Sequence, residues 1–258
     1  MENLTITLIQ SDITWHDAEK NLKRLESVFS NIKTATDLII LPEMFTTGFT
    51  MIPEEVSEPM NGKTVNFLRR FSRELGTDIT GSVVISENNR FYNRLIWVRP
   101  DGMTLTYDKR HLFRMAGEEK IYSPGSDLLT VELKGWRIRP FICYDLRFPV
   151  WSRNAGMKYD LAIYTANWPA KRKLHWDLLL QARAVENQCY VAGVNRSGTD
   201  GNDISYSGRS AVIDFAGKII SRCGDIECVE TVELSGAELL AYRETFPAWK
   251  DCDKFKIL

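Results

Sequence analysis

The hydrophobic and polar positions of the chain follow two alternating periods, one typical of helices and one typical of strands. Residues 18–32 carry apolar side chains at steps of three and four, which places these side chains on one face of an amphipathic helix. Residues 5–9 and 37–41 are short, apolar and rich in β-branched side chains, as expected of buried strands. The same reasoning predicts further helices over residues 64–75, 147–156, 174–187 and 235–244. It predicts further strands over residues 81–85, 91–98, 103–107, 128–133, 136–143, 160–164, 189–194, 205–214 and 218–222.

The succession of helix and strand patterns is continuous, which indicates a single α/β domain over residues 1–258. No linker rich in proline, glycine or serine divides the chain, and no period of 20–50 residues repeats. Residues 246–258, FPAWKDCDKFKIL, form a C-terminal tail with several large apolar side chains. Because a free tail would expose these rings to water, we expect it to pack on the body of the domain or on a partner subunit. This favours a homodimer or a higher homo-oligomer.

Charge and composition exclude several classes of function. The 33 basic residues nearly balance the 34 acidic ones, so no nucleic-acid partner is indicated. The start, MENLTITLIQSD, lacks the pattern of a signal peptide, and no apolar run approaches the roughly 20 residues that span a bilayer. Five cysteines without CxxC spacing favour reduced thiols in a cytoplasm over a disulfide framework. The three histidines are scattered, and no metal site is predicted.

Three polar residues follow predicted strands and have complementary chemistry: Glu43, Lys109 and Cys143. Side chains at the ends of neighbouring strands converge on one mouth of a sheet, where α/β proteins place their active sites. A carboxylate can take the thiol proton, and an ammonium group can stabilise the oxyanion formed on a carbonyl carbon, together with the N–H of Tyr144. Each residue alone also fits a structural role, as a buried apolar thiol, a loop carboxylate and a surface lysine.

At these residues the chain closely resembles the nitrilase superfamily of carbon–nitrogen hydrolases. The matching segments are LPEMFTTGF, YDKRHLF, ICYDLRFP, ANWPAKRKLHWDLLLQARAVENQCYVAGVNR and YSGRSAVIDFAGKII, in the order of the family. The resemblance implies that Glu43 is the general base, Lys109 the oxyanion stabiliser and Cys143 the nucleophile. It also implies a second glutamate, matched by Glu118, with the adjacent Glu119 as the alternative. The implied fold is a four-layer α-β-β-α sandwich that pairs with a second copy.

The segments CYDLRFPVW, NWPAKR and FPAWKDCDKF resemble the ω-amidase branch, which comprises 2-oxoglutaramate and 2-oxosuccinamate amidases. This resemblance implies an enzyme that hydrolyses the terminal amide of a small keto acid to the dicarboxylate and ammonia. The reaction would pass through a thioester and need no metal or organic cofactor. Other amidases, carbamoylases and nitrile hydrolases of the superfamily remain alternatives. A non-catalytic scaffold of the same fold and a metal-dependent hydrolase are rivals of a different class.

A keto-acid substrate carries a carboxylate, which arginine binds through a bidentate fork. Arg172, Arg147 and Arg114 are candidates for this contact, although a structural salt bridge is an equally good interpretation of each. The candidates for the pocket walls are Phe45, Trp168 and Tyr144, with packing in the core as the alternative.

Overall fold

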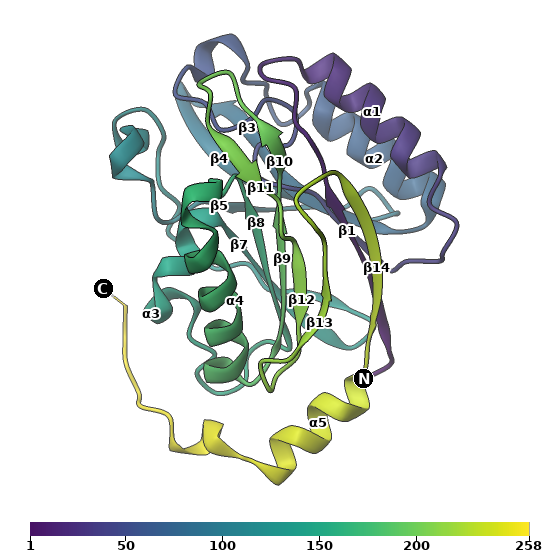
Figure 1. Ribbon diagram of the computed structural model, residues 1–258, viewed down its shortest axis with the longest axis vertical. Helices are drawn as coiled ribbons and strands as arrows, with labels where there is room; N and C mark the ends of the chain where they lie inside the picture. Colours follow the sequence, from purple (N-terminus) through teal and green to yellow (C-terminus); the bar gives the residue numbers. More distant parts are fainter. Residues whose placement is uncertain (258) are drawn as a thin grey trace.

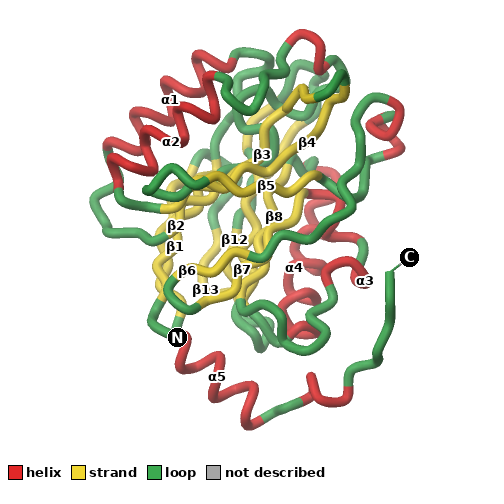
Figure 2. Tube along the Cα trace, turned by 180° about the vertical axis from the view of Figure 1, so that it is seen from behind, coloured by secondary structure: helices red, strands yellow, loops and turns green. Residues whose placement is uncertain are grey.

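Two six-stranded mixed sheets lie face to face, and helices cover the outer face of each, as the computed structural model of residues 1–257 shows (Figures 1 and 2). The first sheet has the order β14-β1-β2-β3-β4-β5, and the second has the order β13-β12-β9-β8-β7-β6. The helices α1 (Ala18–Ser30) and α2 (Lys63–Leu75) flank the first sheet, and α3 (Pro149–Ser152) and α4 (Lys173–Asn187) flank the second (Figure 1). The prediction of a single-domain α-β-β-α sandwich is therefore confirmed.

The strands of the two sheets have the following bounds. The first sheet contains β1 (Leu4–Gln10), β2 (Leu38–Ile40), β3 (Asp78–Glu87), β4 (Arg90–Val98), β5 (Thr104–Asp108) and β14 (Cys228–Leu234). The second contains β6 (Val131–Leu133), β7 (Trp136–Ile142), β8 (Leu161–Ala166), β9 (Tyr190–Asn195), β12 (Ala211–Ile213) and β13 (Ile219–Arg222). A hairpin of β10 (Ser197–Thr199) and β11 (Ser205–Ser207) stands apart from both sheets. Within residues 1–257, no helix is long and apolar enough to cross a bilayer.

The apolar strands are buried on both faces. In β2, Leu38 and Ile40 join the core cluster between the two sheets, whereas Ile39 joins the cluster beneath α1 and α2. Successive side chains of a strand point to opposite faces, so a strand covered on both sides must be apolar throughout. This is why β2 has no polar position.

Local capping signals set the ends of the two helices on the first sheet. The Asp17 carboxylate accepts a hydrogen bond from the N–H of Lys20 at 2.9 Å and so caps α1. Gly76 ends α2 with a φ of +64°, a left-handed conformation that glycine adopts without a steric penalty. Both helices therefore begin or end close to where the sequence predicts.

The structure corrects two predicted elements and adds two strands that were not predicted. The segment 205–214 forms two strands instead of one, because Gly208 and Arg209 adopt positive φ angles of +57° and +58°. The predicted helix over residues 147–156 is reduced to the four-residue α3, which follows the 3-10 turn η4 (Cys143–Arg147). The strands β10 and β14 lie where no strand was predicted.

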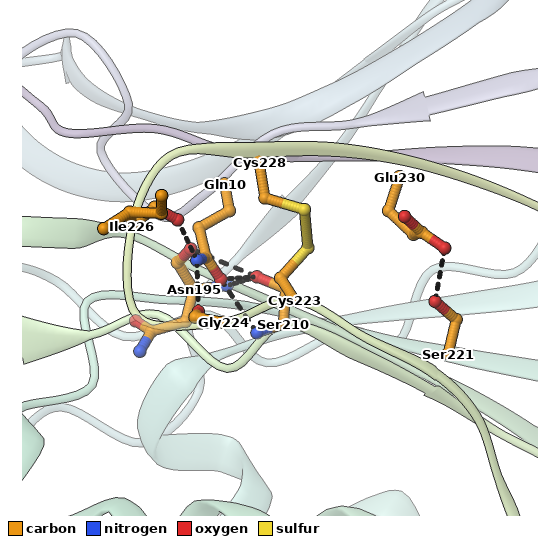
Figure 3. Close-up of a disulfide and its surroundings, with 9 residues drawn as sticks. All are labelled: Gln10, Asn195, Ser210, Ser221, Cys223, Gly224, Ile226, Cys228 and Glu230. Carbon is orange, nitrogen blue, oxygen red and sulfur yellow. Dashed lines mark hydrogen bonds between the residues drawn. A yellow bond between two sulfur atoms is a disulfide. The ribbon is translucent and has the colours of Figure 1, made fainter.

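A disulfide between Cys223 and Cys228 corrects the prediction that all five thiols are reduced (Figure 3). Cys223 directly follows β13 of the second sheet, and Cys228 begins β14 of the first, so the bond links the two sheets. The Gln10 side-chain amide also holds this loop by donating hydrogen bonds to the carbonyl oxygens of Gly224 at 2.8 Å and Ile226 at 2.5 Å. Cys143, Cys189 and Cys252 are free.

The C-terminal tail begins after α5 (Gly236–Thr245) and runs around the outside of the molecule toward α3, on the side of the helices that cover the second sheet (Figure 1). Its first part contacts the body, because the Gln188 side chain donates to the carbonyl oxygen of Phe246 and accepts from the N–H of Trp249. Residues 253–257 are exposed. The part of the prediction that places the tail on a partner subunit stays a prediction.

Candidate active site

The carboxyl ends of strands from both sheets carry polar side chains into one pocket. Glu43 follows β2, Lys109 follows β5, Cys143 follows β7 and Asn167 follows β8, and all four residues line this pocket. Each strand delivers its residue because the chain leaves regular structure at the same edge of the sandwich. The three residues selected from the sequence are thus neighbours in space, although they are as far as 100 positions apart in the chain.

Lys109 forms the centre of a fully buried group of charges. Its ammonium nitrogen lies 2.9 Å from the Glu43 Oε1 and 3.0 Å from each carboxylate oxygen of Glu118. The side chains of all three residues are at most 1 % exposed. Glu118 begins the 3-10 turn η3 (Glu118–Lys120), and the structure therefore places Glu118, the preferred match, against the lysine.

The charges of this group are mutually dependent. Burial alone would lower the pKa of the Lys109 ammonium, but the Glu118 and Glu43 carboxylates outweigh it and raise that pKa above its usual range. Burial raises the pKa of Glu118, and Lys109 opposes the rise. Lys109 is therefore held as a cation within the pocket.

Two asparagines that the sequence analysis did not select orient Glu43. Asn93 of β4 donates to the Glu43 Oε1 at 2.8 Å and to the Glu118 Oε1 at 3.4 Å. The N–H of Asn167 donates to the other Glu43 oxygen at 2.8 Å. Both asparagines are at most 4 % exposed. Asn93 is a lone amide within a strand pattern and gives no signal in a single sequence, so spatial proximity is needed to find it. Asn167 belongs to the ANWPAKR segment, whose resemblance to the family was the signal that could have selected it.

Cys143 lines the pocket from the first position of the turn η4. Its φ of +42° is unusual for a residue with a side chain, and such strain is concentrated at functional sites. The sulfur lies 4.0 Å from the Asn167 carbonyl oxygen. Burial, followed by the charge of the neighbouring Glu43, raises the pKa of the Cys143 thiol well above its usual range, while Lys109 opposes the rise. The resting group is therefore a thiol that faces a carboxylate.

The pocket has a volume of about 310 Å³ and largely aromatic walls. Trp168 and Tyr144 line it as predicted, whereas Phe45 does not. Phe45 is 1 % exposed and packs in the core cluster beneath α1 and α2, close to Gly81. The aromatic wall residues that the sequence analysis missed are Trp15, Phe49, Phe113 and Tyr206.

Two of the three candidate arginines face the pocket. The Arg147 guanidinium lies over the Trp168 ring at 4.6 Å, and the Arg172 guanidinium lies over the Phe113 ring at 5.4 Å. Within residues 1–257, neither arginine pairs with a carboxylate. Burial and the neighbouring Arg172 lower the pKa of Arg147, as expected where two cations share a site. Arg114 is exposed on the turn η2 (Arg114–Ala116) and does not line the pocket.

The arrangement combines a thiol, a carboxylate in contact with it, a buried ammonium group and two cationic side chains further out. These are the components needed for nucleophilic attack on a carbonyl carbon with stabilisation of the oxyanion. In the part of the chain that the structure describes, no cluster of three or more histidine, cysteine, aspartate or glutamate side chains is arranged to hold a metal ion.

Several known proteins are similar to this chain in sequence and in fold. The sequence profile for the carbon-nitrogen hydrolase family matches residues 5–244. The omega-amidase YafV of Escherichia coli K12 is 47 % identical over the full length of both chains. The 2-oxoglutaramate amidase of Bacillus subtilis is 32 % identical, with 97 % of this chain and 98 % of the relative covered. The crystal structure of XC1258 from Xanthomonas campestris, a CN-hydrolase superfamily protein with an arsenic adduct in its active site, superposes over both full chains with a TM-score of 0.98 at 44 % identity.

Proposed function

This chain belongs to the carbon–nitrogen hydrolase family, and from that premise we propose that it is an ω-amidase that hydrolyses the terminal amide of small keto acids such as 2-oxoglutaramate and 2-oxosuccinamate. It is a hydrolase of carbon–nitrogen bonds other than peptide bonds. The products would be the dicarboxylate and ammonia. The observation that carries the choice of substrate is that Arg147 and Arg172 line the same pocket as Cys143.

The first half-reaction forms a thioester on Cys143. Glu43 takes the thiol proton as the sulfur attacks the amide carbon, because the raised pKa of Cys143 leaves little thiolate without a base. Lys109 and the N–H of Tyr144 then stabilise the tetrahedral oxyanion. Protonated Glu43 gives its proton to the leaving nitrogen, and ammonia departs.

The second half-reaction hydrolyses the thioester. Water takes the place of ammonia beside Glu43, which removes a proton as the water attacks the thioester carbon. Glu118 supports this step from behind Lys109, because its carboxylate holds the ammonium group within 3.0 Å. The thiolate leaves and recovers the proton from Glu43, so the resting state is restored.

The arginine pair supports a substrate with a carboxylate at the end opposite its amide. Both guanidinium groups lie over aromatic rings, which limits their motion. One nitrogen of the Arg147 guanidinium lies 3.1 Å from the His175 Nδ1, and its remaining N–H groups and those of Arg172 are the ones that a ligand carboxylate would contact. A hydrogen bond to a charged group contributes about 1.5–3 kcal/mol. Loss of one arginine would therefore lower the affinity for such a substrate by roughly 10- to 150-fold.

The experiment compares ammonia release from 2-oxoglutaramate and from pentanamide, a neutral amide of the same chain length. The wild-type enzyme should prefer 2-oxoglutaramate, and Arg172→Met should lower kcat/KM for that substrate by at least about tenfold. Pentanamide hydrolysis should change by less than about threefold, because it offers no carboxylate. Lys171→Met is the matched control, since it removes an adjacent charge that is exposed and outside the pocket.

Two outcomes would contradict the proposal. Turnover of a nitrile or an N-carbamoyl compound without turnover of 2-oxoglutaramate would assign the chain to another branch of the family. Full activity of Cys143→Ala, together with the absence of an acyl adduct by intact-mass spectrometry, would exclude the thioester route.

We also propose that the protein forms a homodimer or a higher homo-oligomer and acts in the cytoplasm. Support for assembly comes from exposed apolar side chains on α4, where Leu174 is 63 % and Leu178 is 56 % exposed. A cytoplasmic location would keep Cys143 as a free thiol, whereas the Cys223–Cys228 disulfide is the observation that speaks against it. Light scattering on the purified protein tests the assembly, and fractionation of cells tests the location.

A further inference from the structure

Asp145 is a buried carboxylate with an unusually complete set of hydrogen bonds. It is 0 % exposed and lies two residues after Cys143 in the turn η4. Its Oδ1 accepts from the N–H of His111 at 3.0 Å and lies 2.8 Å from the His111 Nδ1. Its Oδ2 accepts from the N–H of Ile142 at 3.0 Å and from the Tyr107 hydroxyl at 2.7 Å.

The partners of Asp145 flank two residues of the site in the chain, Lys109 and Cys143. Tyr107 and His111 lie two residues before and two residues after Lys109, whereas Ile142 and Asp145 itself enclose Cys143. One carboxylate therefore contacts both sides of the segment that carries the ammonium group and both sides of the turn that carries the sulfur. The contact crosses between the sheets, because β5 belongs to the first sheet and β7 to the second.

The turn at Cys143 needs such support. A cysteine with a φ of +42° does not adopt this conformation without surrounding structure that holds it, because its Cβ contacts the backbone there. The hydrogen bond from Ile142 to Asp145 closes the turn around the cysteine. The contacts to Tyr107 and His111 then fix that turn against the end of β5, and the Trp151 indole N–H supports the Tyr107 hydroxyl at 2.9 Å.

We propose that Asp145 is a positioning residue that sets the relative placement of the Cys143 sulfur and the Lys109 ammonium group. The inference rests on the proposed roles of those two residues in amide hydrolysis. Asp145 does not line the pocket and does not act on the substrate. Asp145 holds the Cys143 sulfur and the Lys109 ammonium group at a set separation. When the sulfur attacks the carbonyl carbon of the substrate, the carbonyl oxygen then lies beside the ammonium group.

A buried carboxylate that served only stability would behave differently, and the chain contains one for comparison. Asp160 is also 0 % exposed, and it pairs with Arg137 and Arg243 at the start of β8, the end of the sheet opposite to the pocket. Removal of the Asp160 charge should lower the stability of the fold without changing kcat per folded molecule. Asp160→Asn is therefore the matched control for Asp145→Asn.

The experiment measures kcat, KM and thermal unfolding for both variants, with kcat calculated per folded molecule. Asn has the shape of Asp but offers one acceptor oxygen, so at least one of the N–H or O–H donors around residue 145 loses its partner. We expect kcat of Asp145→Asn to fall by roughly 100-fold, the effect of misplacing reacting groups by about 1 Å, while KM changes by less than about threefold. The rate at which iodoacetamide alkylates Cys143 should fall as well, because Lys109 favours the thiolate and a misplaced sulfur loses part of that effect. This measurement needs no substrate.

A folded Asp145→Asn variant with kcat within about twofold of wild type would overturn the inference, as would an equal loss in Asp160→Asn. If Asp145→Asn does not fold, Tyr107→Phe and His111→Gln decide, since each removes fewer bonds. Each should lower kcat with little change in KM, and wild-type kcat in both variants would overturn the inference. Failure of the proposed function is distinguishable, because it would appear as activity in Cys143→Ala, whatever Asp145→Asn does.

Discussion

Replacing Lys109 by methionine should separate the catalytic contribution of this side chain from its contribution to stability. Methionine has a similar length but no charge, so the change leaves the shape of the site largely intact. In the native site the ammonium group contacts Glu43 at 2.9 Å and Glu118 at 3.0 Å, and all three side chains are buried. Lys109→Met therefore leaves two buried carboxyl groups side by side without a cation.

The expected magnitudes follow from this geometry. Removal of one partner of a buried ion pair costs about 3–5 kcal/mol, because the remaining charge is left unpaired away from bulk solvent. Loss of one oxyanion donor lowers kcat by about 10²–10³-fold. In the wild type Lys109 opposes the rise of the Glu118 pKa, so its removal should raise that pKa further.

The sign of the pH dependence can be stated. A carboxyl group whose pKa is higher in the folded state than in the unfolded state binds more protons when folded, so stability falls as pH rises above the unfolded pKa of about 4.3. The thermal midpoint of Lys109→Met should therefore fall from pH 5 to pH 8 more steeply than that of the wild type. The double variant Lys109→Met/Glu118→Gln removes the excess charge. It should recover much of the lost stability without recovering kcat.

Calorimetry at several pH values and ammonia release from 2-oxoglutaramate provide the two measurements. A midpoint of Lys109→Met equal to that of the wild type at pH 8 would refute the reasoning about the buried charges. A double variant with wild-type kcat would refute the oxyanion role of the ammonium group.

Three further predictions follow from individual contacts. In a Cys252→Ser background, alkylation of Cys143 by iodoacetamide should accelerate only at pH values well above about 8.5, because its raised pKa delays formation of the thiolate; intact-mass kinetics would show this. Cys228→Ser opens the disulfide and should lower the free energy of unfolding by about 2 kcal/mol, or the thermal midpoint by roughly 4–8 °C, with kcat preserved. Cys252→Ser is the control and should leave the thermal midpoint unchanged. Gly125→Ala places a Cβ against the backbone oxygen of Asp108, so calorimetry should show a loss of about 1–3 kcal/mol and the ammonia assay a lower kcat.

Much of the fold was predictable because its signals are local. The apolar stripe of α1 and the apolar run of β2 depend on which face of each element is buried, and that requirement is visible in the side-chain period. The strand β14 was missed because Glu230 and Glu233 interrupt its apolar pattern. It exists through its pairing with β1 at the edge of the first sheet, a contact between the two ends of the chain.

The disulfide also could not be predicted from local sequence patterns. Its two cysteines are five positions apart, with no CxxC spacing to mark them. Their sulfur atoms meet because the chain crosses from β13 of one sheet to β14 of the other at this point. Only the layered arrangement of the sheets decides this, and the inference of reduced thiols from spacing alone was therefore wrong for this pair.

The sequence by itself determined the residue types of the site and, through the order of the motifs, which cysteine to select. Local period and composition carry the residue types and the elements, because they are properties of neighbouring positions, whereas the choice of Cys143 rests on the resemblance of the ordered motifs to the nitrilase superfamily. The tertiary structure decided between Glu118 and Glu119 as the partner of Lys109, and it alone brought Asn93 to Glu43 and Asp145 to the turn at Cys143. Glu43 reaches Lys109 across 66 positions and Asp145 reaches Tyr107 across 38, because the ends of different strands converge. Such contacts depend on how the two sheets pack together, and a single sequence does not encode that packing as a local pattern.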